Sequence, residues 1–468
     1  MKNGRMFLAL IAATAASATL YGADGAQAAA KASIDAAAVD FSATVGPVKP
    51  VNGVGQPPIL GWCDMSMFHY LKEAGIPYSR LHDVGGSFGH NLYVDIPNLF
   101  RDFDADENDP ASYDFAFTDL LMKALVENGV EPYFRLGVTI ENEHRVRAYR
   151  IFPPKDYAKW ARICEHVVRH YTEGWADGFR MNVSHWEIWN EPENSEKIEE
   201  NAMWKAPFSE YICLYSVVSK HLKSKFPHLK IGGYGSCGFY GAGSSWGRPE
   251  EPRVKFLMDS FTEFLEHARA EKLPLDFFSF HCYDKPAFAG RQIEHCRRTL
   301  DAYGFTETEM SLNEWLSSPD RANLGTPRQA AETAAMLAIM QNGPVDDAEI
   351  YDARCGMGAY SPLFNCLTLR PYKAYYVYLA FNELRKLGTA VRVEGTLPEN
   401  VWMCAATDAA GARGAVFIAN LSEKTLPLPK SFGGKTVVRA RFIDADHDFA
   451  DAPADVAPPD SVVLVEVE

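Results

Sequence analysis

Two kinds of apolar pattern alternate along residues 59–387, and this alternation constrains the fold more than any other feature of the sequence. Short apolar runs of strand length are each followed by a longer segment with the spacing of an amphipathic helix. Eight such units in a row are typical of an α/β fold with a closed parallel (β/α)8 TIM barrel. The predicted strands are residues 59–62, 78–82, 131–136, 185–190, 230–233, 276–281, 309–314 and 349–351. The predicted helices are residues 65–74, 115–128, 155–171, 209–225, 253–270, 291–303, 328–341 and 372–387.

The pattern changes at about residue 388. Short alternating runs separated by Asp, Gly and Pro follow, which predicts a C-terminal β-sandwich domain; they are residues 401–406, 414–419, 437–442 and 462–467. A further strand is predicted at 39–45, in a leading segment that we expect to join the sandwich. The predicted organisation is a signal peptide at 1–28, a leading segment at 29–58, a barrel at 59–387 and a sandwich at 388–468.

The first residues have the features of a secretory signal. Lys2 and Arg5 precede an apolar run over residues 6–20, and small residues end in Ala26-Gln27-Ala28, an A-x-A cleavage pattern. The alternative is a membrane anchor, but the run is shorter than the roughly 20 apolar residues that a membrane span needs. We therefore expect a secreted or periplasmic protein.

Composition argues against several classes of partner. The net charge of -15 disfavours nucleic acid and anionic membranes, because both select basic surfaces. The nine cysteines form no C-x-x-C pair and are read mainly as buried thiols. There is no clustered ligand spacing and no glycine-rich phosphate loop, so neither a metal nor another cofactor is expected.

Two glutamates end predicted barrel strands. Trp186 and Ile188 alternate as in a buried strand that stops before Pro192, which places Glu191 at its C-terminal end. Glu314 ends the run 309–314 in the same way. Barrel active sites lie at the C-terminal ends of the strands, and cleavage of a glycosidic bond needs one acid and one carboxylate.

The sequence around these glutamates resembles the retaining glycoside hydrolases of clan A. The resemblance rests on Trp189-Asn190-Glu191-Pro192 and on Asn313-Glu314. It implies that Glu191 is the acid/base and Glu314 the nucleophile, with their carboxyls about 5 to 5.5 Å apart. It also implies that Asn190 binds the 2-hydroxyl of the sugar; the alternative is an asparagine that only forms the turn.

Further substrate-binding candidates lie at other strand ends. By the same resemblance, His281 and Tyr283 belong near the nucleophile, although a buried, structurally satisfied histidine is the alternative for His281. Alternation puts Arg80 and His82 on one strand face, directed into the barrel mouth, and Asp83 is read as a structural cap. The aromatic candidates for stacking against sugar are Trp62, Trp315 and Tyr351, each of which has the core as its alternative, and Trp246 in the loop after the fifth strand.

Residues 61–387 look most like glycoside hydrolase family 39, which contains β-xylosidases and α-L-iduronidases. The similarity lies in Ser-Arg-Leu-His-Asp at 79–83, Trp-Glu-Ile-Trp-Asn-Glu-Pro-Glu at 186–193, Phe-Phe-Ser-Phe-His-Cys-Tyr at 277–283 and Leu-Asn-Glu-Trp at 312–315. The residues around Glu314 depart from the threonine-glutamate-tyrosine arrangement of the xylosidases, so the sugar stays open. The resemblance implies an exo-acting retaining glycosidase on an oligo- or polysaccharide. The alternatives are an endo-glycanase of another clan A family and a non-catalytic carbohydrate-binding barrel.

Overall fold

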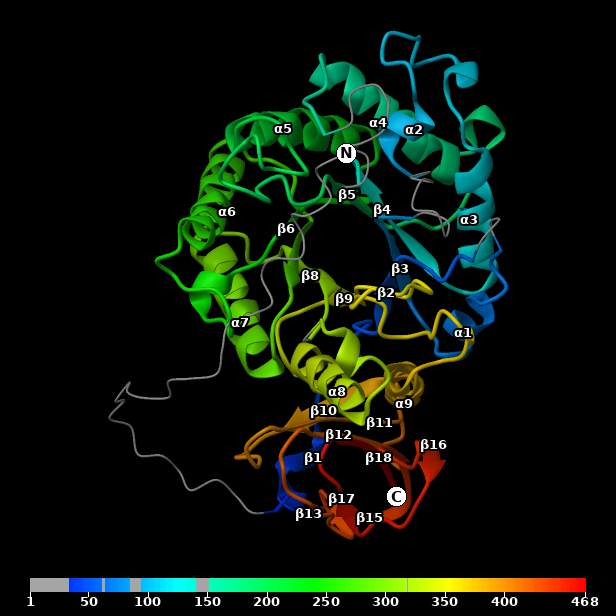
Figure 1. The fold of residues 1–468 in the computed structure, drawn as a ribbon, viewed down its shortest axis with the longest axis vertical. Helices are drawn as coiled ribbons and strands as arrows, with labels where there is room; N and C mark the ends of the chain where they lie inside the picture. The colour runs from blue at the N-terminus through cyan, green and yellow to red at the C-terminus, as the bar shows by residue number, and fades with distance from the viewer. Residues whose placement is uncertain (1–32, 61–63, 85–93, 140–150, 318) are drawn as a thin grey trace, which may run out of the picture.

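Eight parallel strands form a closed barrel in the computed structural model, which describes residues 33–60, 64–84, 94–139, 151–317 and 319–468 (Figure 1). The barrel closes because its first strand, β2, pairs in parallel with both β3 and β9. The predicted fold class is confirmed. The barrel strands are β2 (Gly53–Gly55), β3 (Tyr78–Leu81), β4 (Glu131–Leu136), β5 (His185–Ile188), β6 (Lys230–Ser236), β7 (Phe277–Cys282), β8 (Glu309–Trp315) and β9 (Asp347–Ile350).

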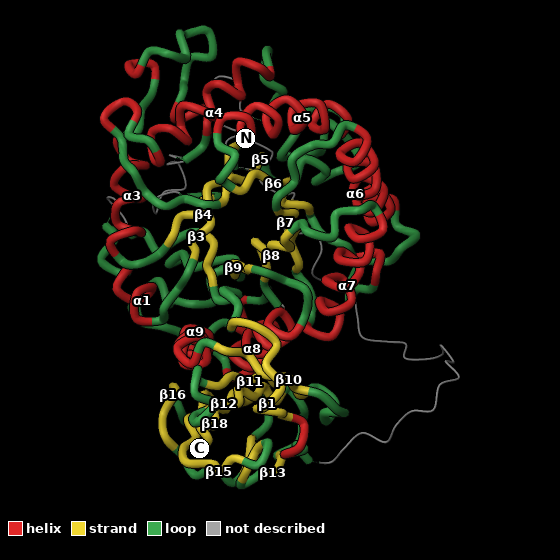
Figure 2. The backbone as a smooth tube through the Cα atoms, turned by 180° about the vertical axis from the view of Figure 1, so that it is seen from behind, coloured by secondary structure: helices red, strands yellow, loops and turns green. Residues whose placement is uncertain are grey.

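Helices surround this ring of strands, as Figure 2 shows. Their N-termini carry the expected signals: Asp156 accepts a hydrogen bond from the Lys159 N–H, and Thr326 accepts one from Gln329. The α-helices are α1 (Phe68–Glu73), α2 (Ile96–Leu99), α3 (Ala116–Glu127), α4 (Tyr157–Thr172), α5 (Phe208–Lys225), α6 (Pro252–Ala270), α7 (Pro286–Ala302), α8 (Pro327–Asn342) and α9 (Lys373–Leu387). Short 3-10 turns are η1 (Ala36–Ala38), η3 (Pro110–Ser112), η5 (Trp175–Asp177), η6 (Tyr240–Ala242) and η7 (Arg321–Asn323). None of the helices in the described ranges is both long enough and apolar enough to cross a membrane.

The first barrel strand was predicted wrongly. It is Gly53–Gly55 and not 59–62, so the barrel begins before residue 59. A three-residue strand with two glycines shows no alternation from which it can be recognised. Close packing requires the glycine, because a Cβ on Gly53 would lie 2.7 Å from the Ala348 carbonyl oxygen of β9. The α7 helix also begins earlier than predicted, since Pro286 occupies its first turn, where proline is well tolerated.

Aromatic rings pack together inside the barrel, toward the amino ends of the strands. Tyr133 stacks on His185 with centroids 4.9 Å apart, and both meet Phe277 edge-on. Above these rings the strands direct buried polar side chains inward, among them Arg80 and Glu187. The packed rings therefore lie directly beneath a polar cluster at the carboxyl ends of the strands.

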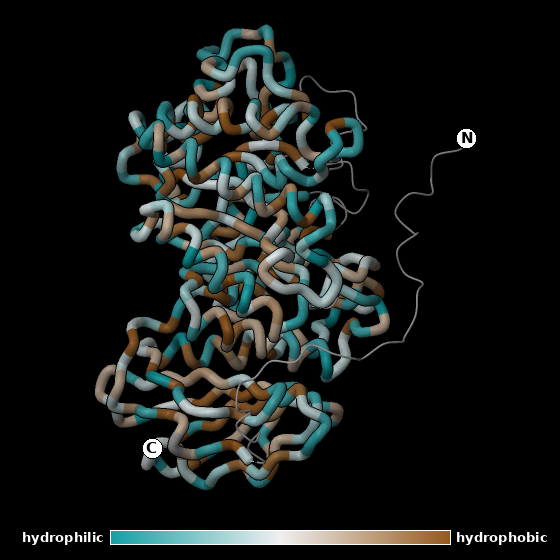
Figure 3. Tube along the Cα trace, turned by 90° about the vertical axis from the view of Figure 1, so that its left-hand side faces the viewer, coloured by the Kyte–Doolittle hydropathy of each residue, from teal (hydrophilic) through white to brown (hydrophobic). Residues whose placement is uncertain are grey.

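The C-terminal domain is an antiparallel sheet with the order β1-β10-β11-β12-β18-β15-β14, with β16 on β15 and a separate β13-β17 pair. Strand β1, from before the barrel, pairs with β10 of this domain. The sheet packs on α8 and α9, where Phe381 meets Phe417 edge-on at 5.8 Å. Figure 3 shows hydrophobic segments running through both domains. The strands are β1 (Val39–Pro47), β10 (Thr389–Val393), β11 (Val401–Thr407), β12 (Gly414–Asn420), β13 (Leu426–Pro427), β14 (Ser431–Phe432), β15 (Lys435–Ile443), β16 (Asp448–Asp451), β17 (Val456–Ala457) and β18 (Ser461–Val467).

Candidate active site

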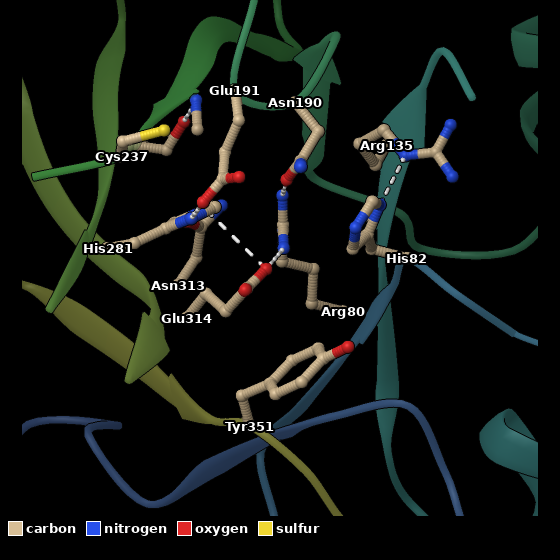
Figure 4. Close-up of polar contacts among 12 residues, drawn as sticks. Arg80, His82, Arg135, Asn190, Glu191, Cys237, His281, Asn313, Glu314 and Tyr351 are labelled. Carbon is tan, nitrogen blue, oxygen red and sulfur yellow. Dashed lines mark hydrogen bonds and ion pairs between the residues drawn. The ribbon is translucent and has the colours of Figure 1, made fainter. Parts of the chain in front are cut away.

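Glu191 and Glu314 face each other across the barrel mouth (Figure 4). Glu191 follows β5 and Glu314 lies near the end of β8. Carboxylate oxygens of the two residues lie within 4.8 Å of one another. This upper limit on the oxygen–oxygen distance is consistent with a retaining pair, whose carboxyl groups lie about 5 to 5.5 Å apart, with no room for an intervening water.

His281, at the end of β7, lies between the two carboxylates. Its Nδ1 is 2.7 Å from Glu191 Oε1, and its Nε2 is 3.7 Å from Glu314 Oε2. The histidine side chain is fully buried, so both contacts are shielded from solvent. The ring is therefore part of the polar cluster at the mouth and not an isolated core histidine.

Arg80 on β3 holds three acceptors with one guanidinium group. Nε donates to Glu187 Oε2 at 2.8 Å, Nη1 to Glu314 Oε2 at 2.9 Å, and Nη2 to Asn190 Oδ1 at 2.6 Å. Burial opposes its charge, but the carboxylates of Glu187 and Glu314 raise the pKa of Arg80 above its usual value. The planar, permanently charged guanidinium suits this role because its donors are fixed in one fork.

The two glutamates and His281 titrate as a linked set. Burial raises the pKa of Glu314, whereas His281, Arg80 and the Tyr283 hydroxyl act in the opposite direction. Burial also acts to raise the pKa of Glu191, but the hydrogen bond and charge of His281 bring it below its usual value. The pKa of His281 is raised: burial opposes its positive charge, and the two carboxylates outweigh that effect. The lowered pKa of Glu191 and the raised pKa of His281 favour the proton of their 2.7 Å contact on His281 in the free site.

Tyrosines line the mouth next to Glu314. The Tyr283 hydroxyl donates to Glu314 Oε1 at 2.5 Å, and burial raises the pKa of Tyr283, which keeps this donor protonated. Tyr351 donates to Asp83 Oδ2 at 2.6 Å. The Tyr283, Tyr351 and Tyr360 rings meet edge-on, with centroids 5.6 to 6.1 Å apart. Asp83, expected to be a structural cap, orients Tyr351.

His82 lies on the Arg135 side of the mouth (Figure 4). Arg135 Nε donates to its Nδ1 at 3.2 Å, and Arg135 itself pairs with Asp95 at 2.6 Å. Burial and the nearby Arg135 charge lower the pKa of His82 well below its usual value. His82 is therefore neutral.

The backbone bends sharply where β5 ends. Trp189 has φ of 77° and Glu191 has φ of 43°, both in the left-handed region that a residue with a Cβ rarely adopts. The Trp189 indole is buried and its Nε1–H donates to the Met203 carbonyl oxygen at 3.0 Å. The backbone N–H of Trp189 donates to the Leu136 carbonyl oxygen at 2.8 Å. Surrounding contacts of this kind are what keep a strained backbone in place, and such strain is concentrated at functional sites.

The aromatic residues predicted to stack against sugar differ in their exposure. Trp315 is fully buried in the hydrophobic core, which favours the core alternative for this residue. Trp246 is 48% exposed and donates to the Tyr283 carbonyl at 3.1 Å, beside the mouth. Trp62 lies outside the described residues.

Among the described residues, two groups of side chains have ligand atoms close enough together for a metal ion. One is Glu191, His281 and Glu314, where the Arg80 guanidinium already supplies positive charge. The other is His185, Glu309 and Asp347, at the opposite end of the barrel. There Lys230 Nζ lies 2.7 Å from Glu309 and supplies the charge.

Several buried residues of the cluster were not identified from the sequence. Glu187 Oε1 accepts from Ser279 at 2.6 Å and from Asn313 at 2.7 Å, in addition to its bond with Arg80. The alternation that buries Trp186 and Ile188 puts Glu187 on the inner face, so a carboxylate inside a strand was the available signal. Arg135 carried the same kind of signal, as a charged residue between Phe134 and Leu136 inside the predicted strand 131–136.

The comparisons with known proteins agree with this geometry. The model of glycosyl hydrolases family 39 matches residues 62–301, slightly more than half of the 468 residues. The beta-xylosidase of Geobacillus stearothermophilus is 28% identical over 222 residues, which cover 46% of this chain and 39% of the relative. The chain thus spans about two fifths of the length of that curated relative.

Solved structures support the fold. A glucosidase from Croceicoccus marinus has a TM-score of 0.69 at 20% identity, covering 92% of this chain and 97% of its own. A family 39 beta-xylosidase from Caulobacter crescentus has a TM-score of 0.62 at 18% identity, covering 92% and 99%. Together with the family match, the barrel and the residues at its mouth, these comparisons lead to one conclusion: the chain belongs to glycoside hydrolase family 39.

Proposed function

We propose that this protein is a retaining glycoside hydrolase that acts on xylosides or related glycosides. The observation that carries the proposal is the pair Glu191 and Glu314, with carboxylate oxygens within 4.8 Å and His281 between them. Glu314 attacks the anomeric carbon while Glu191 gives a proton to the leaving oxygen. Glu191 then takes a proton from the water that hydrolyses the glycosyl-enzyme.

The contacts favour Glu314 as the nucleophile. Arg80 and Tyr283 both donate to its carboxylate and favour the ionised form, although burial outweighs them in the free site and leaves the pKa of Glu314 above its usual value. Glu191 is the more exposed of the two side chains, at 18% against 9%, as suits a group that meets the leaving oxygen. Asn190, fixed by Arg80, is the proposed partner of the sugar 2-hydroxyl.

The charges at the mouth favour a neutral sugar. Arg354 is the basic side chain next to Tyr351, but its Nε donates to the buried Asp352 carboxylate at 2.7 Å. A paired guanidinium attracts a uronate carboxylate less strongly than a free one. The name of the Geobacillus relative, a beta-xylosidase, supports a xyloside and exo-action.

We further propose that the protein is exported, because residues 1–28 have the pattern of a signal peptide. N-terminal sequencing of the protein released from its native host tests this, with Ala29 as the expected first residue.

The activity is tested with a panel of dinitrophenyl glycosides: xyloside, arabinosides, glucoside, galactoside, fucoside and glucuronide. Wild type is expected to release dinitrophenol from one of them, and Glu314→Ala is expected to lose that activity by a factor of about 10⁴ or more. Release from polysaccharides with no activity on the panel would instead identify an endo-glycanase. Binding without turnover of either would identify a non-catalytic carbohydrate-binding barrel.

A further inference from the structure

Glu193, two residues after Glu191, is a fully buried carboxyl group that the proposed chemistry does not use. Its Oε1 accepts a hydrogen bond from Ser236 Oγ at 2.9 Å and one from the Cys237 N–H at 2.8 Å. Its Oε2 has no hydrogen-bond partner in the described part of the chain. A buried carboxyl group is costly to keep, so its presence beside the acid/base calls for a role.

The segment that Glu193 contacts, residues 235–237, also holds the backbone of Glu191. The Glu191 N–H donates to the Gly235 carbonyl oxygen at 2.9 Å. Three hydrogen bonds thus join residues 191 and 193 to one short segment at the end of β6. They fix the acid/base at the position where its own φ of 43° is unfavourable.

We propose that Glu193 is a positioning residue for Glu191: its carboxyl group fixes segment 235–237 against the Glu191 backbone, and its negative charge favours a proton on the neighbouring Glu191–His281 pair. This role rests on the proposed function. It concerns the acid/base step alone, and not the attack by Glu314.

The surroundings of Glu193 determine when that charge is present. Burial, together with the Glu191 charge, raises the pKa of Glu193 to about 7. The other titratable groups facing it are Arg253 of α6, Tyr234 of β6, Tyr211 of α5 and Cys237. Above neutral pH an ionised Glu193 makes loss of the proton from the Glu191–His281 pair less favourable, which extends the protonated form of that pair toward alkaline pH.

The test compares two variants on two substrates of the sugar that wild type cleaves. Glu193→Ala removes the acceptor and the charge, whereas Glu193→Gln keeps an acceptor for Ser236 and Cys237 and removes only the charge. A dinitrophenyl glycoside needs little protonation of its leaving group, and a methoxyphenyl glycoside needs it fully. The measured quantity is kcat/KM, which reports the first chemical step.

Glu193→Ala is expected to lower kcat/KM on the methoxyphenyl glycoside by about tenfold or more, with the dinitrophenyl value within about twofold of wild type. For Glu193→Gln, kcat/KM on both glycosides at pH 6 is expected to stay within about threefold of wild type. The alkaline limb of its kcat/KM profile is expected to move to lower pH. The exposed Glu196→Gln, on the same loop, is the control and should change neither.

Equal losses on both substrates, or no loss on either, would overturn the positioning role. If Glu193→Ala does not fold, Glu193→Gln decides, because an unmoved alkaline limb contradicts the role of the charge. A wild type that cleaves neither glycoside refutes the proposed function itself, and this role with it.

Discussion

Arg80 and Glu314 form a buried ion pair, with Nη1 2.9 Å from Oε2, although 234 residues separate them in the chain. They come from β3 and β8, two barrel strands that are not neighbours. The same guanidinium holds Glu187 and Asn190. One side chain thus connects the proposed nucleophile, a buried carboxylate inside the barrel and the proposed sugar ligand.

Replacing Arg80 with methionine is expected to destabilise the protein by about 3 to 5 kcal/mol, because Glu187 would remain buried without its counter-charge. Activity is expected to fall with it, since Glu314 would be harder to ionise. Urea denaturation measures the first effect and the glycoside assay the second. The control is Arg439→Met, whose partner Asp451 lies 2.6 Å away on the surface; it should leave both quantities nearly unchanged. Equal stability losses in the two variants would contradict the prediction.

Gly235→Ala is expected to remove most of the activity. Gly235 has φ of 62°, and a Cβ there would lie 3.1 Å from Glu187 Oε1 and 3.2 Å from Arg80 Nη2. The added methyl group therefore displaces the side chains that hold the site together.

Gly129→Ala is the matched control for that variant. Gly129 has φ of 75°, and nothing lies within 4 Å of a Cβ built on it. Both variants pay a backbone strain of about 1 kcal/mol. Only Gly235→Ala should lose kcat/KM; a similar loss in Gly129→Ala would show that strain, and not the contact, is responsible.

Glu191→Ala distinguishes the two carboxyl roles. If Glu191 is the acid/base, the variant should still react with a dinitrophenyl glycoside, accumulate the glycosyl-enzyme and be accelerated by azide, a small nucleophile that needs no general base. Glu314→Ala should show neither accumulation nor azide-accelerated formation of a retained product. Stopped-flow release of dinitrophenol and mass spectrometry of the product measure these outcomes. The reverse pattern would exchange the two roles.

Asp347→Asn should change how stability depends on pH. Burial raises the pKa of Asp347 to about 6, above its ordinary 3.8. The folded protein therefore binds this proton more tightly than the unfolded chain, and the group's stabilisation, present below about pH 4, is lost as pH rises through 6. Asparagine carries no such charge, so the variant should gain stability relative to wild type between pH 4 and pH 7.

Urea denaturation at pH 4, 5, 6 and 7 measures this difference. At pH 4 the folded aspartate is neutral and the unfolded one, with its ordinary pKa of 3.8, is only about half ionised, so the free energies of unfolding of the two proteins should differ least there. Parallel stability curves over the whole range would show that the buried carboxyl does not titrate as stated.

Local pattern predicted much of the fold. The predicted strand 131–136 is the observed β4. Its ends could be predicted because glycine and polar residues bound the apolar run. The first strand could not be predicted in this way, since its glycines are required by the approach of β9 and carry no apolar pattern. The sequence left Trp315 open between the core and the sugar site, and only the structure shows that it is fully buried.

The sequence by itself determined that Glu191 and Glu314 lie at the carboxyl ends of parallel strands, because hydrophobic alternation shows where those strands run. Only the tertiary structure decided that Arg80 reaches Glu187, Glu314 and Asn190 together, and that His281 lies between the two carboxylates. The physical reason is the distance along the chain over which each kind of signal acts. Periodicity records which face of each element is buried, whereas these contacts join residues far apart in the chain and exist only once the barrel has closed.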